Sequence, residues 1–436
     1  MRGLFVRRSA TAVGIYVSVA LGFLATIVAT RELHVSGFGD YATVLFAVGL
    51  LQGFFDVTVE EAVVKYGFRY VTREDWPRLS RLLRSAVSLK LVGGALGAVG
   101  LLVFAAVGPS RLAEPLAVGS LIPLVQSLDG LAGTLLFLRS RYDIRSFFLS
   151  WSMLLRLAGV AVGAHFGVTQ AILGILVAQT IGTASVAVAG IAAFRRFPSA
   201  APQPLGDDRG DIRSFMVQST VASGVTSLRT GLGPLLLGAV TSTVQVGLFR
   251  VAQAPQSAFI AVSAPARMVL LTEQTREWER GNQRAVLRGI RNYSLLAAAA
   301  SVVLAPPLYV FIPQLIRHIN GPGYVGAAGA ARLFILAAVV QFVVGWTKSL
   351  PVTIGRPELR LRTQTLESVV ALPLIAVFGA MWGASGAAAA VLVSIVVFAA
   401  VWIVLVLRIE PVDEPSPSAF DEELVAEGAE AGALSP

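Results

Sequence analysis

Arginines within long apolar stretches are the residues of this sequence that point most directly to chemistry. Arg229 lies about 16 residues into the apolar run 213–240, and Arg250 and Arg332 lie in the outer thirds of the runs 244–266 and 326–347. Placing an arginine at mid-bilayer costs at least roughly 2.5 to 3.5 kcal/mol, so it usually faces a cavity or a partner. No acidic residue stands near Arg229 or Arg250 in the sequence. Guanidinium groups match phosphate oxygens bidentately, so such a cavity favours an anion.

Polar residues accompany these arginines at helical spacing. Gln218 and Thr226 share the face of Arg229, and Gln253 follows Arg250. Gln52 lies on one face of the run 39–60, and Arg31 lies at the outer end of the first run. We therefore predict a substrate-binding cleft lined by Arg229, Arg250, Arg31, Gln52, Gln218, Gln253 and Arg332.

Acidic residues inside the apolar runs are fewer, and two of them are candidates for ion coupling. Asp56 lies in the run 39–60 and Asp129 in the run 114–138. Asp129 and Arg156 have comparable depths in adjacent runs, so we expect an internal ion pair between them, because a buried charge needs a partner. Lys90 is expected to extend its amine from the start of the run 86–107 to the membrane surface.

Motifs for covalent or metal chemistry are absent from the sequence. The chain has no cysteine, which excludes disulfides, thiol catalysis and cysteine-ligated metals. Its three histidines, His34, His165 and His318, are far apart and lack metal-ligand spacing. There is no Gly-x4-Gly-Lys-Ser/Thr loop for ATP hydrolysis. We expect no catalytic residues, no metal, no cofactor and no enzyme activity.

Composition identifies the class of protein. Of the 436 residues, 55% are apolar and 14% are charged, and the mean hydropathy is +0.72. These values are typical of a polytopic membrane protein rather than of a soluble domain. Although the net charge is +9, the basic residues lie between apolar runs, so we expect membrane orientation and not nucleic acid binding to explain them.

A spanning helix needs about 20 mostly apolar residues, and by that rule the chain has twelve spans. The predicted limits are 10–30, 39–60, 86–107, 114–138, 147–167, 170–194, 213–240, 244–266, 292–312, 326–347, 366–382 and 386–407. With the N-terminus in the cytoplasm, 27 of the 35 basic residues fall in cytoplasmic segments and three fall outside. This segregation predicts a multi-pass protein of the cell membrane with both termini in the cytoplasm.

The twelve spans divide into six and six at a proline-rich stretch. We predict an N-terminal lobe over 1–197, a cytoplasmic linker over 198–211, a C-terminal lobe over 212–409 and a disordered acidic tail over 410–436. An even number of spans gives both halves the same orientation, so the repeat is parallel. Gly247-Leu248-Phe249 matches Gly39-Asp40-Tyr41 at a shift of 208 residues (247 − 39), in agreement with such a repeat.

Residues 31–65 resemble a known family. Arg31-Glu32-Leu33, the turn Gly37-Phe38-Gly39-Asp40-Tyr41 and the stretch from Glu60 to Lys65 are similar to the Wzx-like polysaccharide-unit flippases of the multidrug/oligosaccharidyl-lipid/polysaccharide exporter superfamily. The chain departs from the family at Asp56-Val57-Thr58, where a small glycine is usual. The resemblance implies an all-α fold of twelve transmembrane helices in two parallel lobes with a central cleft (MATE-like), lined mainly by spans 1, 2, 7 and 8.

The resemblance also implies a function: alternating-access transport of a polyprenyl-pyrophosphate-linked oligosaccharide from the inner to the outer leaflet, for surface polysaccharide synthesis. The expected partners are that lipid-linked oligosaccharide, the bilayer and a glycan polymerase or glycosyltransferases. Two alternatives stay open. A multidrug antiporter of the same superfamily would need acidic residues in the cleft, and a membrane glycosyltransferase or polymerase would incorporate sugar. We predict that Arg229→Ala abolishes export while folding and insertion stay intact.

Overall fold

The computed structural model describes the backbone of residues 2–260, 282–348, 350–354 and 357–408, and of residues 270, 274, 277 and 278. Side chains are described from residue 13 onward; those of Ala222, Thr226 and Arg229 are among the few that lie outside the description. The predicted tail 410–436 also lies outside the described residues.

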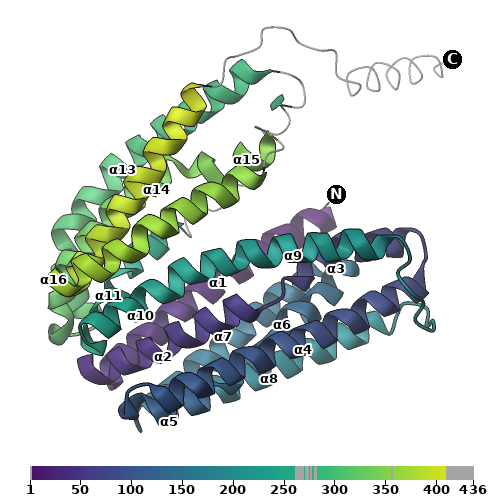
Figure 1. The fold of residues 1–436 in the computed structure, drawn as a ribbon, viewed down its shortest axis with the longest axis horizontal. Helices are drawn as coiled ribbons and strands as arrows, with labels where there is room; N and C mark the ends of the chain where they lie inside the picture. The colour runs from purple at the N-terminus through teal and green to yellow at the C-terminus, as the bar shows by residue number, and fades with distance from the viewer. Residues whose placement is uncertain are drawn as a thin grey trace.

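All regular structure in the described part of the chain is helical (Figure 1). The first lobe contains α1 (Arg2–Glu32), α2 (His34–Phe55), α3 (Val59–Thr72), α4 (Trp76–Val107), α5 (Ser110–Gly119), α6 (Leu121–Leu138), α7 (Tyr142–Ala164) and α8 (Val168–Phe194). The second contains α9 (Asp208–Ser227), the π-helix η1 (Leu228–Leu232), α10 (Gly233–Val240), α11 (Thr243–Ala252), α13 (Gln283–Ile319), the 3₁₀ helix η2 (Pro322–Ala327), α14 (Ala328–Val343), the 3₁₀ helix η3 (Gly345–Lys348), α15 (Leu350–Thr353) and α16 (Pro357–Leu407).

Nine helical segments of the described residues are long and apolar enough to cross a membrane. Three interrupted segments account for the difference between these nine segments and the twelve predicted spans. The α9–η1–α10 segment contains a π-turn. Helix α11 is followed by a turn at Gln253 and by helical residues 254–260, after which the chain leaves the described part. Helix α16 is kinked at Trp382 and Gly383, where Gly383 has φ 60°. The Gln245 side-chain oxygen accepts a hydrogen bond from the Ala384 amide at 2.8 Å, which caps the helix after the kink. The predicted all-α polytopic fold is confirmed, and the described helices are compatible with twelve spans in two lobes.

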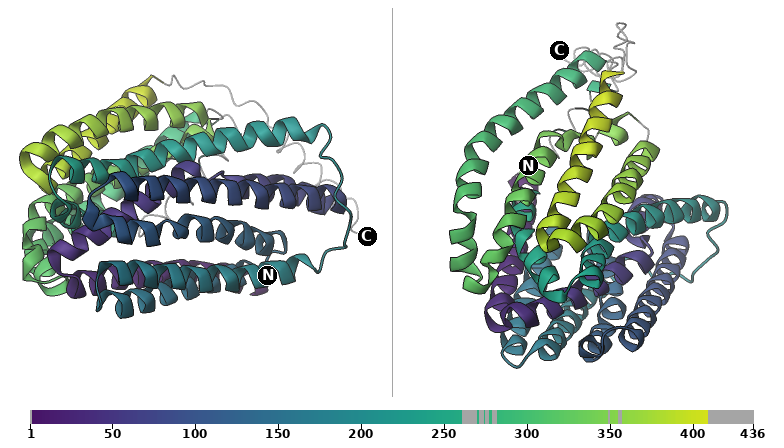
Figure 2. Two further views of the ribbon diagram at one scale, coloured as in Figure 1. Left: turned by 60° about the horizontal axis from the view of Figure 1, so that its bottom comes forward. Right: turned by 60° about the vertical axis from the view of Figure 1, so that its left-hand side comes forward.

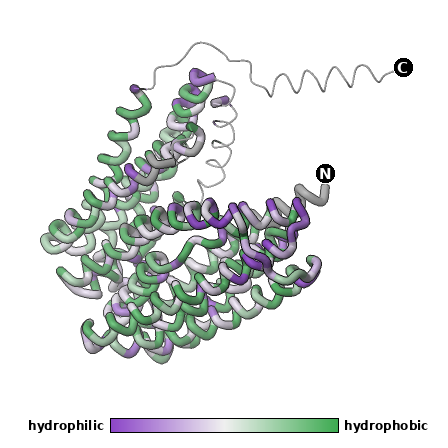
Figure 3. The backbone as a smooth tube through the Cα atoms, turned by 45° about the vertical axis from the view of Figure 1, so that its right-hand side comes forward, coloured by the Kyte–Doolittle hydropathy of each residue, from purple (hydrophilic) through white to green (hydrophobic). Residues whose placement is uncertain are grey.

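Apolar side chains on the outer surfaces of the lobes are those that lipid would cover. Leu296, Val302 and Val303 of α13 are each at least 70% exposed. A soluble protein rarely leaves such a contiguous apolar face uncovered. Hydrophilic residues instead gather toward the end of the helices that carries the connectors 73–75, 139–141 and 195–207 (Figure 3). We call this the basic end, and the other the closed end.

The second predicted span is broken, and the break shapes the interior of the first lobe. Helix α2 ends at Phe55, Asp56 is extended (φ −71°, ψ 106°), and α3 begins at Val59. Gly93 of α4 makes room for this turn, because a Cβ there would collide with the Phe55 carbonyl oxygen. Glu60 and Glu61 lie in the first turn of α3, where carboxylates interact favourably with the helix dipole.

Helix α9 belongs to the second lobe by sequence but lies along the first lobe at the basic end (Figure 1). Asp208 accepts hydrogen bonds from Arg69 at 3.1 Å and from the Tyr70 hydroxyl at 2.9 Å. Burial and the bond to Asp208 raise the pKa of Tyr70, so the hydroxyl remains a donor at neutral pH. Further along α9, Ser219 donates to Glu61 at 2.8 Å.

The two lobes meet at the closed end and diverge toward the basic end (Figures 1 and 2). At the closed end, Asn320 donates a hydrogen bond to the Thr30 hydroxyl at 3.1 Å. The Tyr324 hydroxyl lies 3.0 Å from the Thr30 carbonyl oxygen and 2.8 Å from that of His34. These contacts join α1 and α2 of the first lobe to the α13–η2 connection of the second.

Candidate functional site

Two neighbouring pockets beside Arg250 form the candidate site. The first has a volume of about 230 Å³ and is lined by residues of α1, α2, α7 and α11. The second has a volume of about 220 Å³ and is lined by α2, α6, α7, α8 and α11. Both pockets contain Ala42, Leu45, Arg156 and Arg250, so they are adjacent parts of one cleft. Two guanidinium groups therefore line a shared interior space.

Arg250 reaches this cleft from α11, in the second lobe. Its side chain is exposed to the cleft, and its guanidinium carbon lies 5.3 Å from the centre of the Phe46 ring of α2. An arginine over an aromatic face is held by a cation–π interaction that leaves its N–H groups available. The ring orients the charge without neutralising it.

Arg156 reaches the same space from α7 of the first lobe. Among the described residues, neither Arg156 nor Arg250 forms an ion pair with a carboxylate. Two uncompensated positive charges from opposite lobes in one cleft favour an anionic ligand that bridges them.

Amide side chains complete the polar lining. Gln52 of α2, Gln126 of α6 and Gln179 of α8 line the second pocket together with the two arginines. Gln179 donates a hydrogen bond to the Thr183 hydroxyl at 3.1 Å. An amide offers both donors and an acceptor, which suits the hydroxyl groups of a sugar.

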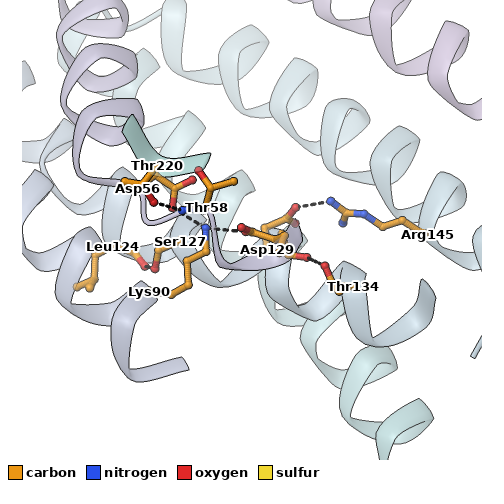
Figure 4. A network of polar contacts seen from close by, with 11 residues as sticks. Asp56, Thr58, Lys90, Leu124, Ser127, Asp129, Thr134, Arg145 and Thr220 are labelled. Carbon is orange, nitrogen blue, oxygen red and sulfur yellow. Dashed lines mark hydrogen bonds and ion pairs between the residues drawn. The ribbon is translucent and has the colours of Figure 1, made fainter. Parts of the chain in front are cut away.

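The expected ion pair between Asp129 and Arg156 is wrong. Asp129 pairs instead with Arg145, at 2.8 Å (Figure 4). Arg145 comes from the first turn of α7, and its long side chain passes over Gly133, where a Cβ would collide with the guanidinium group. Gly133 lies one helical turn after Asp129 and keeps the path open. Arg156 is therefore not paired with Asp129 and lines the cleft instead.

The expectation that Lys90 extends to the membrane surface is also wrong. Its side chain is 1% exposed, and its amine lies 2.5 Å from Asp56 (Figure 4). The same amine lies 2.6 Å from Glu60. The physical reason is the break after Phe55, which brings both carboxylates to α4. Asp56 and Asp129, the candidates for ion coupling, thus each sit in an ion pair within the first lobe.

The other predicted site residues lie elsewhere. Arg31 donates from Nε to the Ile319 carbonyl oxygen at 2.8 Å and also bonds to that of His318, so it joins α1 to the end of α13. Arg332 lies over the ring of Tyr309 at 5.3 Å and donates to its carbonyl oxygen at 3.3 Å. Neither residue lines the pockets at Arg250.

Gln218 is exposed on α9 and bonds to Ser214 of the same helix at 3.3 Å. Gln253 is half-buried directly after α11, where its backbone N–H donates to the Phe249 carbonyl oxygen at 3.0 Å. Arg229 belongs to the π-helix η1, but its side chain lies outside the described part of the structure. Its role stays a prediction.

Sequence reasoning missed Arg156, Gln126 and Gln179 as members of the cleft. The signal was present, since each is a polar residue inside a long apolar run. Arg156 was assigned to a partner on depth alone, and depth does not determine the direction in which a side chain leaves its helix.

Comparison with known proteins identifies the family of this chain. The sequence model of the family described as "Polysaccharide biosynthesis protein" matches residues 8–271, more than half of the chain. The chain belongs to this family. The resemblance to the Wzx-like flippases of the multidrug/oligosaccharidyl-lipid/polysaccharide superfamily is thereby confirmed, and the chain is a multi-pass membrane transporter of that superfamily. A sequence search of curated proteins finds no match.

Solved structures share the fold. The lipid II flippase MurJ in an inward closed conformation has a TM-score of 0.72 and 13% identity, covering 91% of this chain and 87% of its own. An inward-facing multidrug resistance MATE transporter has a TM-score of 0.65 and 14% identity, with coverages of 89% and 93%. A superfamily transporter from Pyrococcus furiosus, whose title describes a binding pocket of reverse polarity, has a TM-score of 0.63, 13% identity and coverages of 92% and 94%.

Proposed function

We propose that this transporter moves a polyprenyl-phosphate- or pyrophosphate-linked oligosaccharide from the inner to the outer leaflet of the cell membrane. The observation that carries the proposal is the charge of the cleft. Arg156 and Arg250 have no carboxylate partner among the described residues, and both line the same pockets. Their guanidinium groups would bind phosphate oxygens, while the neighbouring glutamines would bind sugar hydroxyls.

Orientation follows from the basic connectors. By the positive-inside rule the basic end faces the cytoplasm, as do both chain termini. In this orientation the lobes are joined on the outer side and open toward the cytoplasm, so an anionic head group would enter from the inner leaflet. Release to the outer leaflet would require the closed-end contacts of Arg31, Asn320 and Tyr324 to break. Arg31 thus acts as a gate residue in this proposal, in place of a binding residue.

The multidrug antiporter is the competing function, and the acids of the described spans argue against it. Asp56 and Glu60 are paired with Lys90, and Asp129 with Arg145. A cleft for organic cations needs free carboxylates, whereas this one offers free guanidinium groups. Asp56 and Asp129 remain our candidates for coupling to an ion gradient, acting through these pairs. The proposal keeps the predicted division into two lobes, 1–197 and 212–409, joined by the linker 198–211. It also keeps a glycan polymerase as the expected partner.

Transport by the purified full-length protein in liposomes tests the proposal. The substrate is a fluorescent polyprenyl-pyrophosphate sugar placed in one leaflet, and its appearance in the other leaflet is followed with an impermeant quencher. Protein-dependent flipping that is inhibited by unlabelled substrate supports the proposal. Efflux of an organic cation without flipping would establish the multidrug alternative, and incorporation of labelled sugar into polymer would establish an enzyme.

A further inference from the structure

A larger pocket lies away from the cleft, at the basic end of the first lobe. Its volume is about 700 Å³, roughly three times that of either pocket at Arg250. It is lined by α4, α6, the last residue of α8 and the segment 195–200. Neither the transport mechanism nor the closed-end contacts use it.

One wall of this pocket is apolar. Leu83 and Val87 of α4, Leu131 and Leu135 of α6 and Phe194 of α8 contribute to it. Val87 is 40% exposed, and Ile191, one turn before Phe194, is 48% exposed. Exposed apolar side chains on two transmembrane helices place this side of the lobe against the hydrocarbon of the bilayer.

Basic side chains line the pocket as well. Arg84 of α4 and Arg195, directly after α8, both line the pocket and are both exposed. No described residue forms an ion pair with either guanidinium group, and no carboxylate lines the pocket. Ser80, Arg84 and Ser88 follow at intervals of four, so one face of α4 presents two hydroxyl groups beside the charge.

The position of Arg195 in the chain fits the membrane interface. Arg195 directly follows the apolar run of α8, which ends at Phe194. Phosphate groups of phospholipids lie at this boundary, with the acyl chains below them, and basic pockets between transmembrane helices bind anionic head groups there. The pocket therefore combines basic and apolar side chains, the two chemistries that a phospholipid requires.

We propose that this pocket binds one anionic phospholipid of the bilayer, with its phosphate between Arg84 and Arg195 and an acyl chain along Leu83, Leu131 and Leu135. The ligand is a resident lipid and not the transported molecule, so the site is independent of the proposed function. A bound lipid fills the space between α4 and the end of α8 and ties these two helices together at the basic end.

Native mass spectrometry of the full chain, titrated with phosphatidylglycerol or with phosphatidylcholine of the same acyl chains, tests the site. The wild type should bind one phosphatidylglycerol at least tenfold more tightly than phosphatidylcholine. Arg84→Gln combined with Arg195→Gln should remove that preference. Arg288→Gln is the matched control, because Arg288 is an exposed arginine near the start of α13, outside the pocket, and it should leave the preference unchanged.

A second variant distinguishes lipid binding in the pocket from binding to a basic surface. Val87→Trp fills the apolar wall without changing charge, and it should weaken phosphatidylglycerol binding at least tenfold. Wild-type binding by Val87→Trp, or by the double arginine variant, would overturn the proposal. Equal competition by water-soluble glycerophosphoglycerol would also overturn it, because the site would then bind a free phosphate ester. Monodisperse elution of each variant establishes that it is folded.

Discussion

Gly39 of α2 and Gly247 of α11 meet backbone to backbone where the two lobes join. The Cα atom of Gly39 lies 3.0 Å from the position that a Cβ on Gly247 would take. A Cβ on Gly39 would in turn collide with the Thr243 carbonyl oxygen. The repeat predicted from the sequence, with a shift of 208 residues, makes the two glycines equivalent positions of the two halves. The contact leaves no room for a side chain between α2 and α11 at this point.

Gly39→Ala should open the closed end, because the added methyl group meets backbone rather than a movable side chain. The measurement is the crosslinking of Thr30→Cys with Asn320→Cys, two residues hydrogen-bonded across the lobes at 3.1 Å. The natural chain has no cysteine, so the engineered pair reacts alone. We expect crosslinking to fall at least several-fold. Gly289→Ala is the control, since a Cβ there meets nothing within 4 Å. Unchanged crosslinking in Gly39→Ala would show that the contact between α2 and α11 adjusts to the added methyl group without opening the closed end.

Tyr324→Phe should weaken the same closed end by a smaller amount. The Tyr324 side chain is buried between the lobes, and its one hydroxyl hydrogen serves the carbonyl oxygens of Thr30 and His34. A hydrogen bond of this kind contributes about 0.5 to 1.5 kcal/mol, so the ratio of closed to open protein should fall roughly two- to tenfold. Distance measurements between spin labels on the two lobes provide that ratio. A population equal to that of the wild type would remove Tyr324 from the gate.

Hydropathy was sufficient to predict the fold, whereas the site needed side-chain directions. The twelve spans followed from apolar length and from the distribution of arginines, both of which depend on the bilayer alone. The ion pair between Asp129 and Arg145 could not be predicted in the same way. Arg145 and Arg156 lie three turns apart on one helix, and the depth of a residue within a predicted span does not show which of the two arginines faces Asp129. Lys90 was misplaced for a related reason: the interruption at Asp56 turns two carboxylates inward, and only the packing at Gly93 reveals it.

Arg156→Gln and Arg250→Gln should each slow lipid-linked sugar transport, and the double variant should abolish it. A charge-assisted hydrogen bond to phosphate is worth about 1.5 to 3 kcal/mol, so each single change should cost roughly ten- to a hundredfold in transport rate. Lysine at either position keeps the charge but loses the paired donors, so it should restore part of the rate. The liposome assay measures these rates.

The matched control for the site arginines is Arg81→Gln. Arg81 is an exposed arginine at the start of α4, outside both pockets of the cleft. It should transport like the wild type. If Arg156→Gln and Arg250→Gln both transported normally at normal expression, the cleft would not bind the phosphate.

Lys90→Met should destabilise the first lobe, because it leaves Asp56 and Glu60 without their shared cation. Removing one partner of a buried ion pair costs about 3 to 5 kcal/mol. Here the carboxylate side chains are 34% and 25% exposed, so water screens part of the cost and we expect about 3 kcal/mol or less. The measurement is the thermal unfolding midpoint of the detergent-solubilised protein, compared with that of Arg81→Met on the same helix.

Neutralising the acids as well distinguishes charge from packing. The triple variant Lys90→Met, Asp56→Asn, Glu60→Gln has no unpaired charge, so its midpoint should recover most of the loss. A triple variant as unstable as Lys90→Met would mean that the lysine stem, packed beside the break after Phe55, supplies the stability. If the triple variant is stable but its transport no longer responds to a pH gradient, then the ion pairs of Lys90 with Asp56 and Glu60 couple the gradient to the movement of α2. A stable triple variant with an unchanged pH response would assign these charges to structure alone.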